Sequence, residues 1–436
     1  MRAHCLPLLL LLLLMGLCYA LPPLIVSREI ERVMAAAAAG AAGPIDLAGC
    51  SAEPEEDMTT LELIRETGYA AEEHFVSTED GYILALHRIP GSAGAGSPAV
   101  LLQHALLESS FCWVVSGRAR GLGQSTAYLV HATYILADEG YDVWMGNARG
   151  NSYSRNHTSL SPSEPGFWNF SWHEMGKYDL PAEIEYITRL KKASSLLYVG
   201  HSMGTTAFYA MASERPAVAS KVKAMFGLAP VAFTDHAKGP FWLIGSALRR
   251  AQRNRHSSAG NLEGTSEFFA QSGYFKFAAK CICNRPLLRD LCRAIVFSTV
   301  GFDPQQLNSS WLPLILSHTP AGTSFKTILH FAQGIESRRF LHYDYGAERN
   351  AAIYGSAEPP EYDLSKIDVP VALFWAENDF LAQPRDVLRL YDRLPRKIDM
   401  QRIDNPNFNH LDFLWGRDAP ELVYSRLLRL MERYRA

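Results

Sequence analysis

Short apolar runs alternate with amphipathic stretches along much of the chain, which is typical of strands and helices that follow one another. Within residues 72–90, the turn Glu79–Gly81 separates two strand-like stretches and predicts a β-hairpin. Beyond the hairpin the pattern predicts strands at 99–103, 142–144, 195–199 and 223–228, and helices at 125–139, 179–191 and 203–213. Such alternation predicts an α/β protein with a doubly wound, mostly parallel sheet.

The alternation stops after Val231 for more than a hundred residues. Residues 233–355 are rich in aromatic residues and amphipathic helical patterns, and the sheet pattern then resumes with strands at 369–378 and 397–403 and a helix at 420–435. We expect 61–232 and 356–436 to form the core and 233–355 to form a cap over the edge where parallel strands end. The alternative is an extra helical layer away from that edge.

The N-terminus has the features of a secretory signal peptide. Arg2 precedes an almost unbroken leucine run from Leu6 to Leu17, and Cys18–Ala20 offers a small-residue cleavage site. The run is shorter than the roughly 20 residues that span a bilayer, and no later segment is more apolar. We therefore expect residues 1–20 to be removed, residues 21–60 to form a flexible extension, and the mature protein to be secreted without an integral membrane segment.

Composition narrows the class of protein. A chain of 436 residues that is 48% hydrophobic suits one large core with an insertion. The net charge of -3 and the lack of a basic run interleaved with aromatic residues argue against nucleic acid as a partner. The sequons at Asn156, Asn169 and Asn308 agree with secretion and predict glycosylation sites.

Five cysteines remain once the leader is removed, at positions 50, 112, 281, 283 and 292. An odd number leaves at least one thiol unpaired within the chain. Cys283 and Cys292 are near enough in sequence for a disulfide to close a short loop. Cys281 and Cys283 form a C-x-C pair without a matching second pair, so we expect no zinc site there.

The segment Leu196–Gly204 ends an apolar run with the pattern G-x-S-x-G, and a helical pattern follows it. A strand, a sharp turn and a helix would hold Ser202 exposed above a sheet, because the small glycines let the turn close. The backbone N–H of Met203, at the start of the helix, would face an oxyanion that forms beside the serine. These features predict a nucleophile elbow with Ser202 as the nucleophile.

Hydrolases with such an elbow place their catalytic residues in the order serine, acid, histidine. Asp379 follows the apolar stretch 369–378, and His410 is the only histidine after it. We therefore predict Asp379 as the acid and His410 as the base. Competing acids are Glu377, inside the strand pattern, and Asp386 and Asp392, in the following helical pattern.

Three other positions invite a functional interpretation. His201, beside the nucleophile, is expected to pack as a structural residue rather than serve as a second base. Trp113 either lines an acyl pocket or packs in the core. The pair His173-Glu174 begins the pattern of a zinc protease but lacks its second histidine, so no metal site is predicted from it.

With these residues in place, the chain from about Gly68 onward resembles the acid lipases of the gastric and lysosomal type, in particular an insect-type secreted lipase. The resemblance rests on the elbow and on four segments: DGYILALHRIP, YDVWMGNARGNSYSRNH, FWNFSWHEMGKYDLPA and FNHLDFLWG. It implies the α/β-hydrolase fold, a Cys283–Cys292 disulfide in the cap, and no cofactor or metal. It also implies that the residue after the family's H-G pair, here Leu106, gives the second oxyanion N–H.

One position departs from the family pattern, since the chain reads His104-Ala105-Leu106-Leu107 where the family has H-G-L-L. A β-carbon at Ala105 would restrict the backbone that aims the Leu106 N–H. On this hypothesis the oxyanion hole works slowly, and Ala105→Gly raises turnover.

The resemblance implies a secreted serine lipase that hydrolyses triacylglycerols, sterol esters or both at an oil–water interface, in the gut lumen or another extracellular space, or in a lysosome-like compartment. We expect a monomer. The alternative is a catalytically impaired carrier or storage protein for lipids, for which Ala105 is the one mark.

Overall fold

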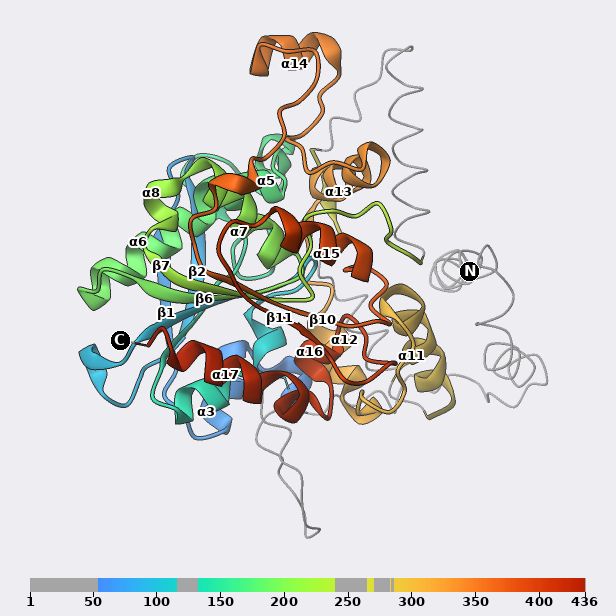
Figure 1. Ribbon diagram of the computed structural model, residues 1–436. Helices are drawn as coiled ribbons and strands as arrows, with labels where there is room; N and C mark the ends of the chain where they lie inside the picture. The colour runs from blue at the N-terminus through green and yellow to red at the C-terminus, as the bar shows by residue number, and fades with distance from the viewer. Residues whose placement is uncertain (1–53, 116–131, 240–264, 270–282, 284–285, 436) are drawn as a thin grey trace, which may run out of the picture.

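A nine-stranded sheet, β1–β7, β10 and β11, forms the centre of the protein (Figure 1). The computed structural model describes residues 54–115, 132–239, 265–269, 283 and 286–435, and all statements below concern those residues. Along the sheet the strands run in the order β1-β2-β4-β3-β6-β7-β10-β11, and β5 pairs with β2. The bounds are β1 Glu72–Ser77, β2 Tyr82–Ile89, β3 Ala99–Gln103, β4 Asp142–Met145, β5 Asn156–His157, β6 Leu196–His201, β7 Val222–Leu228, β10 Val371–Trp375 and β11 Lys397–Arg402.

The sheet is mostly parallel. Strands β1 and β2 form the predicted antiparallel hairpin, and β2 and β4 are also antiparallel. From β4 to β11 every neighbouring pair is parallel. In this parallel part the carboxyl ends of β3, β6, β7 and β10 meet at one edge, which is where ligands bind in such sheets.

Helices cover both faces of the sheet, as the doubly wound prediction requires. In the view of Figure 1, α6, α7 and α8 lie above the sheet and α3 and α17 lie below it. The helices outside the β7–β10 connection are α3 Thr60–Glu66, α4 Ala132–Asp138, α5 Trp172–Glu174, α6 Leu180–Lys191, α7 Met203–Glu214, α8 Pro216–Ala219, α15 Pro384–Arg393, α16 Asp412–Trp415 and α17 Ser425–Glu432. Short π-helical turns, η6 Met175–Asp179 and η10 Pro420–Tyr424, lead into α6 and α17.

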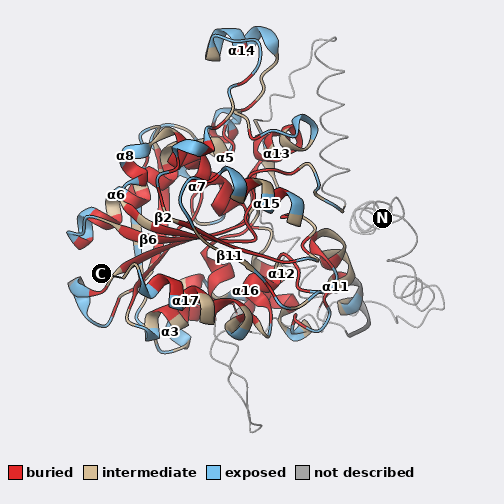
Figure 2. Cartoon of the chain, viewed as in Figure 1, coloured by how far each residue is buried: buried red, intermediate tan, exposed pale blue. Residues whose placement is uncertain are grey.

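The central strands are buried on both faces. Every residue of β3, β4, β6 and β10 is buried (Figure 2). Their sequences are accordingly continuous apolar runs rather than alternating ones, as expected for parallel strands between two helical layers.

A long excursion separates two strands that are neighbours in the sheet. β7 and β10 pair in parallel, and residues 229–370 run between them. This connection contributes α11 Pro286–Val300, α12 Leu312–His318, α13 Phe325–Ser337 and α14 Ala347–Tyr354, together with the small hairpin of β8 Glu267–Phe268 and β9 Thr323–Ser324. In Figure 1, α11, α12 and α13 lie to the right of the sheet, and α14 lies at the top of the picture, above α5 and α13.

Some boundaries differ from prediction. The strand predicted at 369–378 is limited to β10, so that Asp379 lies in the loop after the strand rather than directly at its end. The helix predicted at 420–435 begins with the π-helical turn η10. The predicted signal peptide 1–20, most of the extension 21–60 and part of the helix at 125–139 lie outside the described residues.

The buried carboxyl group of Glu183 makes a prediction about acid stability. Its side chain is fully buried on α6, and neither oxygen has a hydrogen-bond partner among the described residues. Burial, and the neighbouring Asp179, raise the pKa of this carboxyl well above its ordinary value. The stability that it contributes is therefore fully present at acidic pH and is lost as the pH rises through the folded-state pKa.

We expect Glu183→Gln to melt at the same temperature as the parent protein at pH 4 and at a higher temperature at pH 7.5. The glutamine keeps the shape of the side chain but cannot ionise. Thermal unfolding at both pH values checks this, with the exposed Glu185→Gln on the same helix as the control. A melting-temperature difference that does not change with pH would contradict it.

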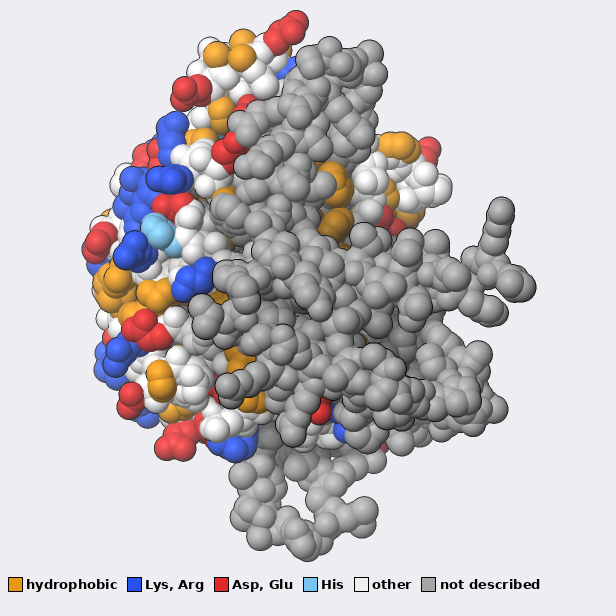
Figure 3. All heavy atoms as spheres, turned by 90° about the vertical axis from the view of Figure 1, so that its right-hand side faces the viewer, with side chains coloured by type: hydrophobic (Ala, Val, Ile, Leu, Met, Phe, Trp, Pro, Cys, Tyr) orange, Lys and Arg blue, Asp and Glu red, His pale blue; other side chains and the backbone are white. Residues whose placement is uncertain are grey.

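Within the described part of the chain, no helix combines the length and apolar character needed to cross a bilayer. On the face that Figure 3 shows, acidic and basic side chains are interspersed on the described surface.

Candidate active site

Ser202 lies at the sharp turn between β6 and α7 with a backbone that few L-residues adopt. Its φ is 51° and its ψ is -114°. Such a conformation costs of order 1–3 kcal/mol and persists only where the surrounding structure enforces it. The Ser202 N–H donates to the carbonyl of Leu228 at 3.0 Å, which ties the turn to β7.

The two glycines of G-x-S-x-G are required by close approach of neighbouring backbone. A β-carbon at Gly204 would lie 2.4 Å from the carbonyl oxygen of Gln103, and one at Gly200 would lie 3.0 Å from the backbone of Gly204 and Thr205. The small residues therefore let β6, α7 and the end of β3 meet tightly. As a result, the serine and the loop after β3 lie at the same edge of the sheet.

Asp379 is fully buried and its carboxylate is held on several sides. Its Oδ1 accepts the backbone N–H groups of Leu381 and Ala382, each at 2.8 Å. Its Oδ2 lies 2.8 Å from Nδ1 of His410. The Oδ1 atom also lies 2.9 Å from Nδ1, so the backbone donors fix a carboxylate that faces the imidazole with both oxygens.

His410 lies in the loop between β11 and α16, and only 2% of the residue is exposed. While Nδ1 faces Asp379, Nε2 is buried and has no hydrogen-bond partner among the described residues. Ser202 and His410 both line one cavity. A carboxylate that holds Nδ1–H leaves Nε2 as a lone-pair acceptor, which is the form a general base needs.

The loop of His410 is tied to the connection between β7 and β10. The His410 N–H donates to the Val300 carbonyl at 3.3 Å, and the Asn409 side chain donates to the Gly301 carbonyl at 3.1 Å. Gly301 has a φ of 112°, and a β-carbon there would lie 2.0 Å from the Asn378 carbonyl. The C-terminal end of α11 and the residue after it thus contact both the loop that carries Asp379 and the loop that carries His410.

His201 supports the backbone of His410 rather than facing the cavity. Its Nε2 lies 2.9 Å from the His410 carbonyl, which accepts, and its Nδ1 lies 3.7 Å from Oε2 of Glu108. Burial alone would raise the pKa of Glu108. The interactions with His201 and His104 lower this pKa by more than burial raises it, so the pKa lies below its ordinary value. A structural role for His201 agrees with the prediction. Glu108 was not predicted, since no local pattern marks a carboxylate that meets a residue so distant in sequence.

In the loop after β3 the left-handed backbone lies at Leu107 and not at Ala105. Leu107 has a φ of 63°, whereas Ala105 is not among the described non-glycine residues with positive φ. The Leu107 carbonyl accepts the Ala321 N–H at 2.7 Å, and the Ala105 N–H donates to Glu108 at 3.2 Å. Ala105 therefore does not adopt the left-handed conformation that glycine alone favours, and its effect on the oxyanion hole stays a prediction.

We therefore expect Ala105→Gly to leave kcat for ester hydrolysis within about twofold of the parent value, since no strain is relieved. Steady-state hydrolysis of a soluble ester checks this. Leu107→Gly is the matched comparison, because it relieves a left-handed residue two positions away in the same loop and is expected to raise the melting temperature. A severalfold rise in kcat for Ala105→Gly would instead support the hypothesis of a slowed oxyanion hole.

The cavity that Ser202 and His410 line has a volume of about 320 Å³ and walls that are predominantly apolar. The long connection supplies much of the wall: Ile295, Val296, Thr299 and Val300 from α11, Leu312, Ile315 and Leu316 from α12, and Ile328, Phe331, Ala332 and Ile335 from α13. Among the two tryptophans near the site, Trp415 lines the cavity. Trp113 is fully buried in the core and is not among the lining residues, so packing is the role that the structure gives it.

Cys283 and Cys292 form a disulfide with an S–S distance of 2.01 Å. Cys112 is a buried free thiol, and Cys50 and Cys281 lie outside the described residues. The three sequon asparagines, Asn156, Asn169 and Asn308, are all exposed.

Two family models match the chain. Residues 60–117 match the partial alpha/beta-hydrolase lipase region, and residues 98–270 match the alpha/beta hydrolase fold. The second match includes the nucleophile elbow and the loop after β3, so the fold predicted from the sequence is confirmed.

Curated relatives match over nearly the whole length. The chain is 37% identical to the human lysosomal acid lipase/cholesteryl ester hydrolase, over 88% of this chain and 92% of that protein. It is 38% identical to the human gastric triacylglycerol lipase, over 87% and 92%. It is 39% identical to Lipase 1 of Drosophila melanogaster, over 86% and 80%. Insect and mammalian relatives are thus about equally similar, and the insect assignment stays a prediction.

Proposed function

Since this chain belongs to the acid lipase family, we propose that it is a secreted serine hydrolase that cleaves carboxylic esters of neutral lipids. Ser202 would be the nucleophile, His410 the base and Asp379 the acid. One observation carries the proposal: Ser202 and His410 line the same apolar cavity, and Asp379 holds the ring nitrogen of His410 that faces away from it.

In the proposed reaction Ser202 Oγ attacks the ester carbonyl while Nε2 of His410 takes the hydroxyl proton. The carboxylate of Asp379 keeps the second ring proton on Nδ1 and stabilises the imidazolium. His410 then gives the proton to the leaving alcohol, and an acyl-enzyme remains. Water, activated in the same way by His410, releases the fatty acid. Each step uses groups of the chain itself.

Two backbone N–H groups would hold the oxyanion. Met203 is the first residue of α7, where N–H groups have no partner within the helix. Leu106 lies beside the cavity in the loop after β3. The dipole of α7 adds positive potential at Met203. Donors of this kind are worth roughly 3 to 4 kcal/mol each in comparable sites.

The cavity favours a long apolar acyl group over a short polar one. Its lining is aliphatic and aromatic apart from Glu108, a few hydroxyl groups and the site residues. Apolar walls gain free energy when they bury hydrocarbon. Triacylglycerols and sterol esters both carry such groups, and the names of the two human relatives point to these two classes. We propose residues 233–355 as the cap that supplies the acyl site.

The proposed secretion rests on the leader at residues 1–20, and the exposure of the three sequons is compatible with glycosylation. The alternative, a catalytically impaired lipid carrier, rests on Ala105 alone, and Ala105 has no positive φ.

Hydrolysis of emulsified trioleoylglycerol and cholesteryl oleate by the purified secreted protein, from pH 4 to pH 9, tests the function. Serine-dependent release of oleate from either would support it, and the ratio of the two rates would assign the substrate class. A folded protein that releases no fatty acid from either would overturn it in favour of a carrier.

Filling the cavity from α13 is expected to separate long from short substrates. Ala332 is buried in the cavity wall, so Ala332→Phe should lower kcat/KM for an oleoyl ester at least about tenfold while a butyryl ester is hydrolysed nearly as before. Rates on p-nitrophenyl oleate and butyrate measure this. Ala351→Phe, on the exposed α14, is the matched control. Equal loss on both esters would argue against an acyl site at α13.

A further inference from the structure

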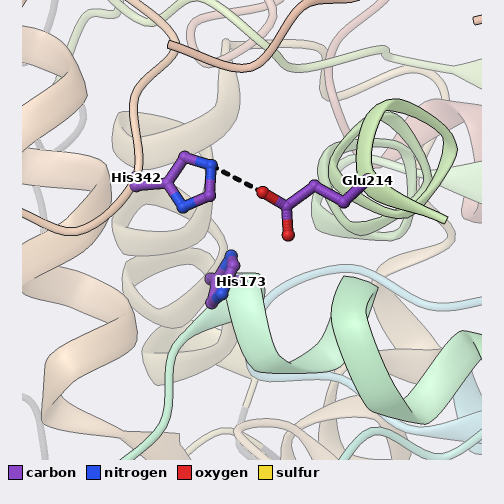
Figure 4. Close-up of side chains that lie close together, drawn as sticks. All are labelled: His173, Glu214 and His342. Atoms are coloured by element: carbon purple, nitrogen blue, oxygen red, sulfur yellow. Dashed lines mark ion pairs between the residues drawn. The ribbon is translucent and has the colours of Figure 1, made fainter. Parts of the chain in front are cut away.

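Two histidines and a glutamate from three distant parts of the chain converge away from Ser202. His173 lies on α5, Glu214 is the last residue of α7, and His342 follows α13. Each offers one ligand atom, and these atoms all lie within 4.8 Å of one another. Figure 4 shows His173 reaching up from α5 toward the space between the other two side chains. The His173-Glu174 pair has no second histidine nearby in sequence, but the fold brings His342 close to His173.

The three side chains are held by ordered neighbours. Nε2 of His342 lies 2.7 Å from Oε1 of Glu214, and the His342 ring stacks on Tyr362 with ring centroids 4.2 Å apart. The backbone of this segment is paired, since the N–H of His342 donates to Pro360 and that of Tyr362 donates to Phe340. His173 is fixed through Nδ1, which lies 2.5 Å from the Tyr362 hydroxyl.

We propose that His173, Glu214 and His342 form a binding site for a divalent transition metal, with Zn²⁺ as the best fit. Two imidazoles and one carboxylate are a ligand set that zinc favours, at distances of about 2.0 to 2.2 Å. Tetrahedral ligands then stand roughly 3.3 Å apart. The ligand atoms of the cluster lie within 4.8 Å of one another, and those of His342 and Glu214 lie 2.7 Å apart, so small side-chain rotations would bring them to that spacing.

The surroundings suit a metal rather than an ion pair alone. With Nδ1–H of His173 donated to the Tyr362 oxygen, Nε2 keeps its lone pair for a metal, which is the usual arrangement of a ligand histidine and its outer partner. His342 also borders a cavity of about 350 Å³, from which water could take the fourth position.

The carboxylate of Glu174, which neighbours His173 in sequence, does not compete for the metal. Glu174 accepts the Ser171 N–H at 2.7 Å and lies 3.8 Å from Lys326, so its carboxylate is engaged elsewhere. Lys177 lies near enough to interact electrostatically with His173 and Glu214, so a metal at the site would have to tolerate its positive charge. The proposed site joins α5 and α7 to the β7–β10 connection, which makes it a structural clamp.

A second cluster, Asp235, His236 and Asp386, is the built-in comparison. Its three ligand atoms also lie within 4.8 Å of one another. However, Arg389 lies 3.3 Å from Asp235. The carboxylate of Asp386 accepts both the backbone N–H and the ring N–H of His236. These bonds satisfy the cluster without a metal, so we assign the metal to the first cluster.

The experiment is titration of the purified, chelator-treated protein with Zn²⁺ by calorimetry and with Co²⁺ by visible absorption, at pH 7.5. We expect one ion per chain, a melting temperature that rises with free Zn²⁺, and Co²⁺ bands typical of four-coordinate nitrogen and oxygen ligands. His173→Asn and His342→Asn should each weaken binding more than about 100-fold, and Tyr362→Phe about 10-fold or more, as loss of an outer partner does.

Glu214→Gln keeps the shape of the side chain and the bond to His342, so it tests the site even if the histidine variants fail to fold. His236→Asn is the matched control and should bind Zn²⁺ as the parent does. The proposal is overturned if the parent takes up no ion at micromolar Zn²⁺, if Glu214→Gln binds as tightly as the parent, or if His236→Asn abolishes binding. Ester hydrolysis measured alongside reports on Ser202 and so keeps a failure here separate from a failure of the proposed function.

Discussion

Ser202→Ala is expected to reduce kcat for ester hydrolysis by about 10⁴- to 10⁶-fold, the range seen when a triad serine is removed. The alanine has no oxygen to attack the carbonyl, and Nε2 of His410 loses the proton that it would accept. The fold should survive, because no described contact of the Ser202 side chain holds the turn. The turn is held by the backbone bond to Leu228 and by the close approach at Gly204. Rates on a soluble and on an emulsified ester, with circular dichroism of the variant, measure both outcomes.

The strained backbone at Ser202 allows a second test, in which the stability of two variants is compared. With a φ of 51°, the residue is expected to cost stability that a glycine would recover, by about 1 kcal/mol. Ser202→Gly should therefore melt higher than Ser202→Ala and be equally inactive. At such a site the strained backbone of the catalytic residue lowers the stability of the fold while activity requires it. Near-parent turnover by either variant would contradict the assignment of Ser202 as nucleophile.

The sequence predicts those parts of the site whose signals are local. A strand, a tight turn and a helix are close together in the chain, so G-x-S-x-G could be placed at the turn before β7 or β10 was known. The pair of Asp379 and His410 could be predicted because chain order left one histidine, and the structure brings these two side chains within 2.8 Å. Central strands were also predictable, since burial on two faces requires continuous apolar runs.

Residues that meet only through the tertiary fold were not predictable. Glu108 lies beside His201 and His342 beside Glu214, and neither pair has a spacing that a pattern can detect. The hypothesis about Ala105 depends on a similar contact. A family glycine implied a special backbone at that position, but the residue of this loop with positive φ is Leu107, whose carbonyl accepts the N–H of Ala321 from the β7–β10 connection. Backbone conformation at a loop depends on such distant partners.

Asp379→Asn is expected to lower kcat by about 10⁴-fold while leaving the surrounding structure almost unchanged, as loss of the triad carboxylate does in comparable hydrolases. The backbone N–H groups of Leu381 and Ala382 point at Oδ1. Nδ1 of His410 lies 2.9 Å from Oδ1 and 2.8 Å from Oδ2. The asparagine must therefore keep its carbonyl oxygen at the Oδ1 position and place its NH₂ group at the Oδ2 position, which is the nearer to His410. An NH₂ group can only donate to Nδ1, which moves the ring proton to Nε2 and removes the lone pair that Ser202 needs.

Asp386→Asn is the matched control for this variant. Asp386 is buried to a similar extent and bonds to His236 in the same way that Asp379 bonds to His410, but neither Asp386 nor His236 lines the cavity of Ser202. We expect its kcat to stay within a few fold of the parent. If the two variants lost activity equally, the loss at Asp379 would reflect a buried Asp–His pair that stabilises the fold. If only Asp379→Asn loses most of its kcat while the two variants have the same melting temperature, the loss cannot come from the fold. It then assigns the His410 imidazole as the group that takes the serine proton.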